Sequence, residues 1–157
     1  MIMRRCDREV KDQQGIADIL TRCKVCRIAM QDDRGLYIVP VNFGYVFEDG
    51  KLTLYFHGAR EGRKAEALRE RTPVAFEMDC DHRLTEGSLA CEYSFSYSSI
   101  TGSGTASLVD DFWDKQKALA LLMKHQTGKD FLFTRDEAEA VAVFAVMADT
   151  FSAKRRA

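Results

Sequence analysis

The spacing between apolar segments limits the folds open to this chain more than any other feature of it. Between residues 25 and 57, three segments rich in β-branched and aromatic residues are separated only by the short connectors QDDRG and EDG. Such segments, bounded by turn residues, are typical of β-strands. Parallel neighbours would need a crossover connection of a dozen or more residues. The sequence therefore predicts antiparallel strands at 25–30, 36–47 and 51–57, joined by hairpins.

Three further strands and three helices complete the prediction. Strands are expected at 74–81, at 91–109 with a bend or bulge at Gly102 and Gly104, and at 140–154. Helices are expected after Asp12, from Gly62 to about Arg71, where Thr72-Pro73 ends the helix, and after Asp111, with Gly128 just past the end. Their inward residues are predicted to be Ile16, Ile19, Leu20 and Cys23 in the first helix and Trp113, Leu119, Leu122 and Met123 in the last.

Strands dominate this pattern, so the fold class is mainly β with appended helices. We expect an antiparallel barrel or half-open sheet in a single domain covering residues 1–157. A chain of this length buries roughly two-thirds of the surface that its unfolded form exposes. A core is therefore available without disulfides, and the five cysteines are expected to be reduced thiols.

Composition argues against several classes of partner. The net charge of −1 gives no general attraction to nucleic acid or to an anionic membrane. No apolar run approaches the roughly 20 residues of a membrane helix, and the first residues lack the apolar stretch of a secretion signal. We expect a cytoplasmic protein that binds neither membrane nor nucleic acid.

Two phosphate-binding signatures are incomplete in this sequence. The segment that starts at Gly58 is one residue short of a P-loop and has Ala65 where that loop needs a hydroxyl for Mg²⁺. Gly102-Ser103-Gly104 lacks the third glycine of a dinucleotide fingerprint, and a strand follows it rather than a helix. Neither a nucleoside triphosphatase nor a Rossmann site is expected.

The junction between a strand and a helix in YFHGAREGRKAEAL, residues 55–68, is the stronger candidate. Free N–H groups and the positive end of the helix dipole favour an anion there, and Arg63 and Lys64 add two cations. Cations at a helix start are otherwise unfavourable, which favours a phosphate site over an ordinary solvated surface. His57 ends the strand, and Gly58 allows close approach of a ligand, although a structural role for His57 is also open.

The other histidines and the cysteines receive plainer interpretations. His125 lies near a helix end, where it would stabilise the terminus when protonated. A zinc site from Cys23, Cys26, Cys80 and His82 lacks a second pair with finger-like spacing, so no metal is expected.

Several segments together resemble the pyridoxamine 5′-phosphate oxidase-like flavoproteins, in particular the branch of nitroimidazole-resistance proteins. The resemblance runs from about Arg4 to Lys154 and is carried most specifically by VPVNFGY and YFHGAREGRK, with SSITGSGTASLVDD and LMKHQTG further on. It implies a split β-barrel that binds FMN, assembled as a homodimer with two flavin sites at the subunit interface.

The resemblance also implies roles for particular residues. Arg63 and Lys64 match the pair that grips the FMN phosphate, and His57 and Gly58 lie beside the ribityl chain and ring. Backbone groups for the flavin ring would come from Ile38, Val39, Pro40, Val41 and Asn42. Residues from Ser98 to Thr101, Ser98 and Ser99 first, would come from the other subunit.

The activity implied is reduction of a small, electron-poor substrate such as a nitroimidazole, with His57 as the candidate catalytic residue. The segment with tryptophan and arginine that clasps substrate in true pyridoxamine phosphate oxidases has no counterpart near Ala157, which disfavours vitamin B6 oxidation. Two alternatives stay open. One is a non-catalytic flavin or haem carrier, and the other is a deazaflavin-dependent reductase, which the net charge disfavours.

Overall fold

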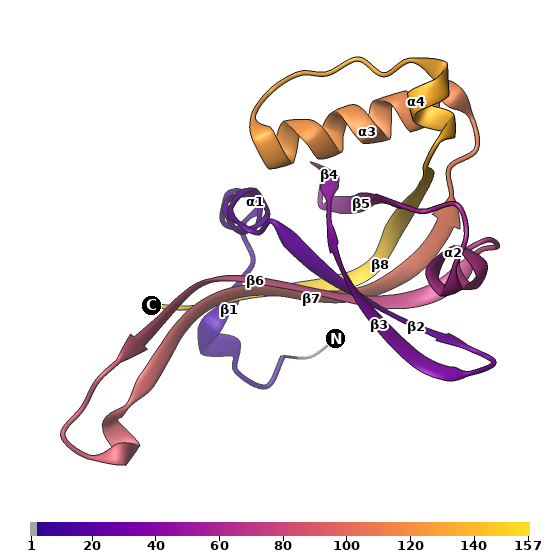
Figure 1. Ribbon diagram of the computed structural model, residues 1–157. Helices are drawn as coiled ribbons and strands as arrows, with labels where there is room; N and C mark the ends of the chain where they lie inside the picture. Colours follow the sequence, from indigo (N-terminus) through magenta and orange to yellow (C-terminus); the bar gives the residue numbers. More distant parts are fainter. Residues whose placement is uncertain (1–2) are drawn as a thin grey trace.

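The structure is a computed structural model that describes residues 3–157. Its strands form one open antiparallel sheet in the order β3-β2-β6-β7-β8-β5-β4, with β1 beside β8 (Figure 1). The strands are β1 Glu9–Val10, β2 Val25–Asp32, β3 Gly35–Asn42, β4 Gly44–Glu48, β5 Lys51–Gly58, β6 Thr72–Thr85, β7 Ser94–Leu108 and β8 Ala142–Arg156. This arrangement confirms the mainly β, antiparallel fold, and the sheet bends into a split barrel that does not close.

Four α-helices accompany the sheet in the described residues. They are α1 Gln13–Arg22, α2 Arg63–Ala67, α3 Phe112–Thr127 and α4 Arg135–Glu139, and short 3₁₀ turns lie at Cys6–Arg8 and Ala90–Glu92. As predicted, Asp12 and Asp111 cap α1 and α3 by accepting hydrogen bonds from the backbone, and Gly128 follows α3 with φ of 74°. No helix within residues 3–157 is long and apolar enough to cross a membrane.

The core lies on the concave side of the bent sheet. Alternate residues of each strand point there, as Leu52, Leu54 and Phe56 do in β5, each at most 2% exposed. α1 adds Ile19 and Leu20, and both are fully buried. A second, smaller cluster forms where α3 and α4 pack on the opposite side of β5 and β8 (Figure 1).

The strand predicted at 36–47 is in fact two strands. The strand is interrupted at Phe43, which is fully buried. β3 pairs with β2, whereas β4 pairs with β5. Gly44 then packs against the backbone of α3, where an added Cβ would lie 2.4 Å from the amide nitrogen of Leu122. The tertiary contact with α3 therefore divides a segment whose local pattern is continuous.

The helix predicted from Gly62 to Arg71 is much shorter in the structure. α2 ends at Ala67 because Leu68 turns into the core, where it is fully buried. The hydroxyl of Thr72 donates hydrogen bonds to the carbonyl oxygens of Ala67 and Glu70, and β6 begins at that residue. The predicted start of the helix is confirmed to within one residue, and the predicted end near Arg71 is wrong.

Two side-chain predictions for α3 are also wrong. Trp113 is 71% exposed rather than inward, since the first turn of α3 presents it to solvent. His125 donates a hydrogen bond from Nε2 to the carbonyl oxygen of Cys23 at 2.7 Å, beside the rings of Phe43 and Tyr45. Burial lowers the pKa of His125, so it packs as a neutral ring instead of stabilising the helix end by its charge.

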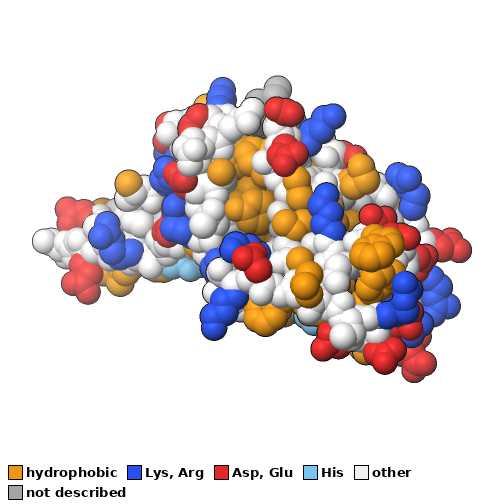
Figure 2. Space-filling view, turned by 90° about the horizontal axis from the view of Figure 1, so that it is seen from above, with side chains coloured by type: hydrophobic (Ala, Val, Ile, Leu, Met, Phe, Trp, Pro, Cys, Tyr) orange, Lys and Arg blue, Asp and Glu red, His pale blue; other side chains and the backbone are white. Residues whose placement is uncertain are grey.

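The long strands β6 and β7 continue past the body of the protein as a hairpin, residues 81–95, which we call the arm (Figures 1 and 2). A bulge lies at its base between Cys80 and Arg83. A second register shift lies opposite Ser103 and Gly104, close to the predicted position, but the extra residue is Asp149 of β8, so the bulge predicted in β7 is in the neighbouring strand. The arm carries large apolar side chains that are about half exposed or more, namely Leu84, Leu89, Tyr93 and Phe95.

Candidate functional site

The candidate site lies where β5 ends and α2 begins. His57 and Gly58 are the last residues of β5, and Gly62, with φ of 114°, leads into α2 at Arg63 and Lys64. Four of the predicted residues therefore come from one short stretch of backbone. Because α2 has only five residues, the two side chains decide the chemistry of this corner, rather than the helix dipole.

Arg63 already has an anionic partner within the chain. Its Nε and Nη2 atoms donate to the two carboxylate oxygens of Asp32 at 2.8 and 2.9 Å, and its guanidinium carbon lies 4.4 Å from the centroid of the Tyr37 ring. The hydrogen bonds from Arg63 lower the pKa of Asp32 to about 2. Asp32 therefore fixes the guanidinium group in a bidentate pair, and Nη1 is the end of the fork that faces no carboxylate.

Lys64 is the cation at this corner without such a partner. Its side chain is half-buried, and no carboxylate of residues 3–157 lies within 4 Å of Nζ. Desolvation lowers the pKa of Lys64, which shows that the surroundings do not compensate its charge. The side chain passes over Gly58, where an added Cβ would lie 2.6 Å from Nζ. Gly58 is thus the residue that leaves room for the ammonium group.

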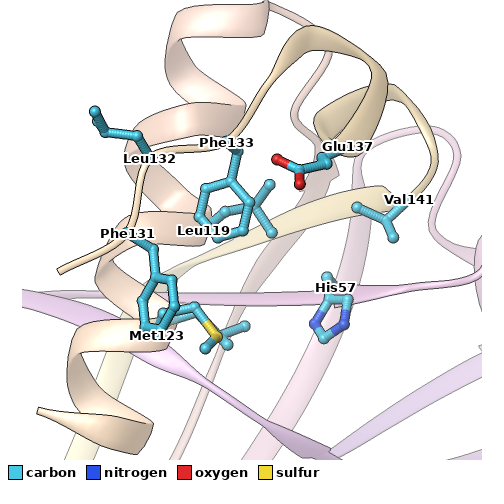
Figure 3. Close-up of a pocket in the computed structure, with 9 residues that line it drawn as sticks. His57, Leu119, Met123, Phe131, Leu132, Phe133, Glu137 and Val141 are labelled. Carbon is cyan, nitrogen blue, oxygen red and sulfur yellow. The ribbon is translucent and has the colours of Figure 1, made fainter. Parts of the chain in front are cut away.

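His57 faces an apolar cavity of about 300 Å³ between the sheet and the α3–α4 segment (Figure 3). In Figure 3 the rings of Phe131 and Phe133 lie across the cavity from the imidazole, and the Glu137 carboxylate lies at one side. His57 is exposed to solvent on one side, but partial desolvation and the neighbouring Lys64 charge lower its pKa. Near pH 7 the ring is therefore neutral, with one N–H donor and one acceptor nitrogen.

The predicted flavin-ring segment, from Ile38 to Asn42, forms the end of an edge strand. In the described sheet β3 pairs only with β2, so the other edge of its backbone is free. The side chain of Ile38 is 64% exposed, whereas Val39 and Val41 belong to the core and its border. Pro40 is tolerated because the strand is at an edge. The amide of Asn42 donates to the Lys24 carbonyl and the Gln126 side chain, which gives it a structural task.

The two predicted serines of β7 are divided between the faces of the sheet. Ser98 is 1% exposed and opposes Cys80 and Arg155, while Ser99 opposes Asp79 and Lys154. Successive side chains of a strand point to opposite faces. Ser99 shares its face with Ile38 and Pro40 across β2 and β6, and Ser98 does not.

Other contributors to the site were not predicted. Asp32 lies in a polar turn of the sequence, and only the fold brings it to Arg63. Glu137 and the two phenylalanines of the 129–134 segment gave no local signal beyond their composition. Within the described part of the chain, no group of three or more histidine, cysteine and acidic side chains is arranged to hold a metal ion.

Comparison with known proteins gives a consistent result. The sequence profile of the family described as pyridoxamine 5′-phosphate oxidase matches residues 12–155. A proposed 5-nitroimidazole antibiotic resistance protein from Bacteroides thetaiotaomicron is 30% identical, with a TM-score of 0.79 over 94% of this chain and 86% of the other. A comparison with curated protein sequences finds no match.

Two structures of lower identity share the fold. The FAD and heme binding protein from Mycobacterium smegmatis is 23% identical with a TM-score of 0.77, over 94% of this chain and 73% of the other. The flavocytochrome from Azotobacter vinelandii is 21% identical with a TM-score of 0.79, over 99% of this chain and 72% of the other.

Proposed function

Because the chain belongs to the pyridoxamine 5′-phosphate oxidase family, we propose that it binds FMN and reduces a small, electron-poor substrate such as a nitroimidazole or another nitroaromatic compound. The observation that carries this proposal is the uncompensated ammonium group of Lys64, held over Gly58 next to the cavity of His57. A half-buried cation without a carboxylate is the natural counterpart of a phosphate group.

Arg63 and Lys64 would hold the FMN phosphate in different ways. Asp32 occupies Nε and Nη2 of Arg63 and so leaves Nη1 to donate to a phosphate oxygen in a fixed orientation. Lys64 would supply a point charge from the Gly58 side. Charge-assisted hydrogen bonds of this kind contribute roughly 1.5–3 kcal/mol each. Asp32 is in this scheme a positioning residue.

The flavin ring would lie against the free edge of β3. Alternate residues between Ile38 and Asn42 turn their backbone groups to this free edge and would donate to and accept from the ring, with Pro40 able to offer only its carbonyl oxygen. The exposed side chain of Ile38 adjoins an apolar hollow that Ala29, Ala75 and Thr101 also line. These small side chains leave room for a flat molecule.

Bound FMN supplies hydride or electron transfer, and the protein residues arrange the substrate. The cavity of His57 suits a small aromatic compound, because all but two of its lining residues are apolar. Reduction of a nitro group to a nitroso group consumes two electrons and two protons and releases water; NADH or NADPH is the proposed electron donor. The neutral His57 ring would donate its N–H to an oxygen atom of the substrate and hold it in place.

We further propose that two copies of the chain assemble as a homodimer with the flavin between them. The face of the sheet that carries Ile38 and Ser99 also exposes Leu36 at 85% and Met147 at 60%. The arm adds further exposed apolar side chains. A second copy that covers this face and grips the arm would remove these surfaces from water.

The test is anaerobic reduction of the purified protein by NADH or NADPH, followed by re-oxidation with nitroaromatic compounds, quinones and oxygen. We expect bound FMN in the isolated protein and faster re-oxidation by a nitroaromatic compound than by oxygen. Lys64→Gln should lose most of the FMN while keeping its circular dichroism spectrum, and Lys117→Gln, an exposed lysine of α3, should retain it. Full FMN retention in Lys64→Gln would contradict the phosphate assignment, and re-oxidation by oxygen alone would contradict the reductase assignment.

The second candidate is a non-catalytic flavin or haem carrier, with His57 as an axial ligand. A neutral imidazole facing a cavity is the state that ligates iron, which favours this alternative, and proteins of the same fold include a FAD and heme binding protein. The cavity of about 300 Å³ is at the small end of ligand pockets, which disfavours it. The absorption spectrum of the isolated protein separates the two, because flavin gives paired visible bands and haem a single intense one.

A further inference from the structure

A basic cavity lies at the base of the arm, far from the candidate flavin site. It has a volume of about 390 Å³, and its lining includes Arg83, Arg155 and Arg156 together with Ser96 and Ser98. Ala142 at one end of β8 opposes Gly58, and Arg155 near the other end opposes Ser98. The cavity and the corner of Lys64 are thus at opposite ends of β8, and Figure 1 shows the C-terminal end of this strand beside the arm.

The register of the strands places two arginines and two serines of the cavity on one face, whereas Arg156, which opposes Tyr97, belongs to the other face. Arg83 directly opposes Ser96 in the β6–β7 pair, and Arg155 directly opposes Ser98 in the β7–β8 pair. Residues directly opposite each other in an antiparallel pair share a face, and so do residues two apart in a strand. Two guanidinium groups and two hydroxyl groups therefore converge from three adjacent strands.

The positive charge of this cavity is not neutralised within the chain. For residues 3–157, no side-chain carboxylate lies within 4 Å of the guanidinium groups of Arg83, Arg155 or Arg156. Asp81 lines the same cavity, but Arg22 donates three hydrogen bonds to it at 2.9–3.1 Å, and both Arg22 and the Ser98 hydroxyl lower its pKa. The three arginines keep an excess of positive charge in the cavity.

The two serines strengthen the case for a ligand. Among the described residues, the buried polar side chains are Ser96 at 7% exposure and Ser98 at 1%, and both belong to this cavity. Hydroxyl groups beside guanidinium groups supply neutral and charged donors to the same oxygen atoms, which is the donor set that a phosphate group takes. The hydroxyl of Ser98 also interacts with Asp81, so Ser96 is the hydroxyl donor of the cavity without that competing acceptor.

We propose that this cavity binds the phosphate group of a small phosphorylated molecule, at a site separate from the flavin. Guanidinium groups bind phosphate in bidentate fashion, so Arg83 and Arg155 would hold the anion from two sides with Ser96 and Ser98 beneath it. The cavity has room for an organic group as well as the phosphate. The proposal does not depend on the chemistry at His57.

The test is calorimetric titration of the flavin-loaded protein at constant ionic strength, set with chloride. The probes are inorganic phosphate, AMP and adenosine. We expect phosphate and AMP to bind and adenosine not to bind. Tighter binding of AMP than of phosphate would identify an organic phosphate as the ligand, and equal binding of the two would identify the free anion. Arg83→Gln and Arg155→Gln should each weaken binding roughly tenfold or more, because each removes a charge-assisted contact.

Arg71→Gln is the matched control, since Arg71 is an exposed arginine outside the cavity, and it should leave phosphate binding unchanged. The proposal is overturned if neither anion binds, or if the two cavity variants bind both anions like the unsubstituted protein. Loss of flavin in Arg83→Gln or Arg155→Gln would show instead that the cavity serves the flavin, and a shift from dimer to monomer would show that it serves the interface.

Discussion

At the scale of single residues, the histidines link stability to pH. Desolvation is the first cause of the lowered pKa in both His57 and His125, and the larger effect is expected from His125, because His57 is exposed to solvent. In the unfolded chain the two histidines therefore take up protons near the ordinary histidine pKa of about 6.5. In the folded chain they take up protons only at lower pH. Above that pH the histidines do not reduce the free energy of unfolding. We expect the free energy of unfolding to fall as the pH falls below about 6.5.

Urea unfolding between about pH 5 and pH 7.5 measures this effect, since each histidine contributes at most one proton to the slope. His125→Gln keeps a donor for the Cys23 carbonyl and should flatten the slope, as should His57→Gln. An unchanged slope in the double variant of His57 and His125 would assign the pH dependence to other groups.

At the scale of elements, two glycines leave room for different neighbours: Gly44 for a packed helix and Gly58 for the side chain of Lys64. A Cβ at Gly44 would meet the backbone of α3, which cannot give way without moving the helix from β4. A Cβ at Gly58 would meet only the flexible end of the Lys64 side chain. Gly44→Ala should therefore destabilise the protein by about 1–3 kcal/mol, and Gly58→Ala should leave the fold intact but displace Lys64.

Thermal unfolding and FMN titration of both variants test this pair. We expect a lower Tm for Gly44→Ala, and a nearly unchanged Tm with weaker FMN binding for Gly58→Ala. Equal FMN affinity in Gly58→Ala and the unsubstituted protein would contradict the position given to Lys64.

The elements also show what the sequence could predict. Caps at Asp12 and Asp111 and the glycine after α3 are local signals, and the corresponding helices form as expected. The division of residues 36–47 depends on the contact of Gly44 with α3, and the length of α2 on the burial of Leu68. Neither contact is encoded in neighbouring residues.

The same distinction applies to the candidate site. The stretch from His57 to Lys64 could be found in the sequence because its residues are neighbours along the chain. The pairing of Arg63 with Asp32 joins the start of α2 to the β2–β3 hairpin, and the separation of Ser98 from Ser99 depends on which face of β7 is covered. Such relations follow from strand register, which the sequence alone did not supply.

At the scale of the whole molecule, we predict that assembly and FMN binding are lost together. Ile38→Glu places a charge on the exposed face of β3, which should shift the protein from dimer to monomer and release most of the FMN. Light scattering coupled to size-exclusion chromatography gives the mass, and absorbance gives the flavin content. Trp113→Gln, at an exposed apolar residue of α3, is the control and should remain a dimer with flavin. A monomer that keeps its FMN would place the flavin within one chain.

β8 pairs with β7 along nearly its whole length and with β5 and β1 on its other side, yet it is formed by residues 142–156. During synthesis on the ribosome, β5 therefore has only β4 as a neighbour, and β7 only β6, until residues 142–156 have been made. The two parts of the sheet, β3-β2-β6-β7 and β5-β4, can be joined by strand pairing only after residues 142–156 emerge, and such distant pairings make folding slow. Until then the nascent chain exposes strand edges that a chaperone could shield.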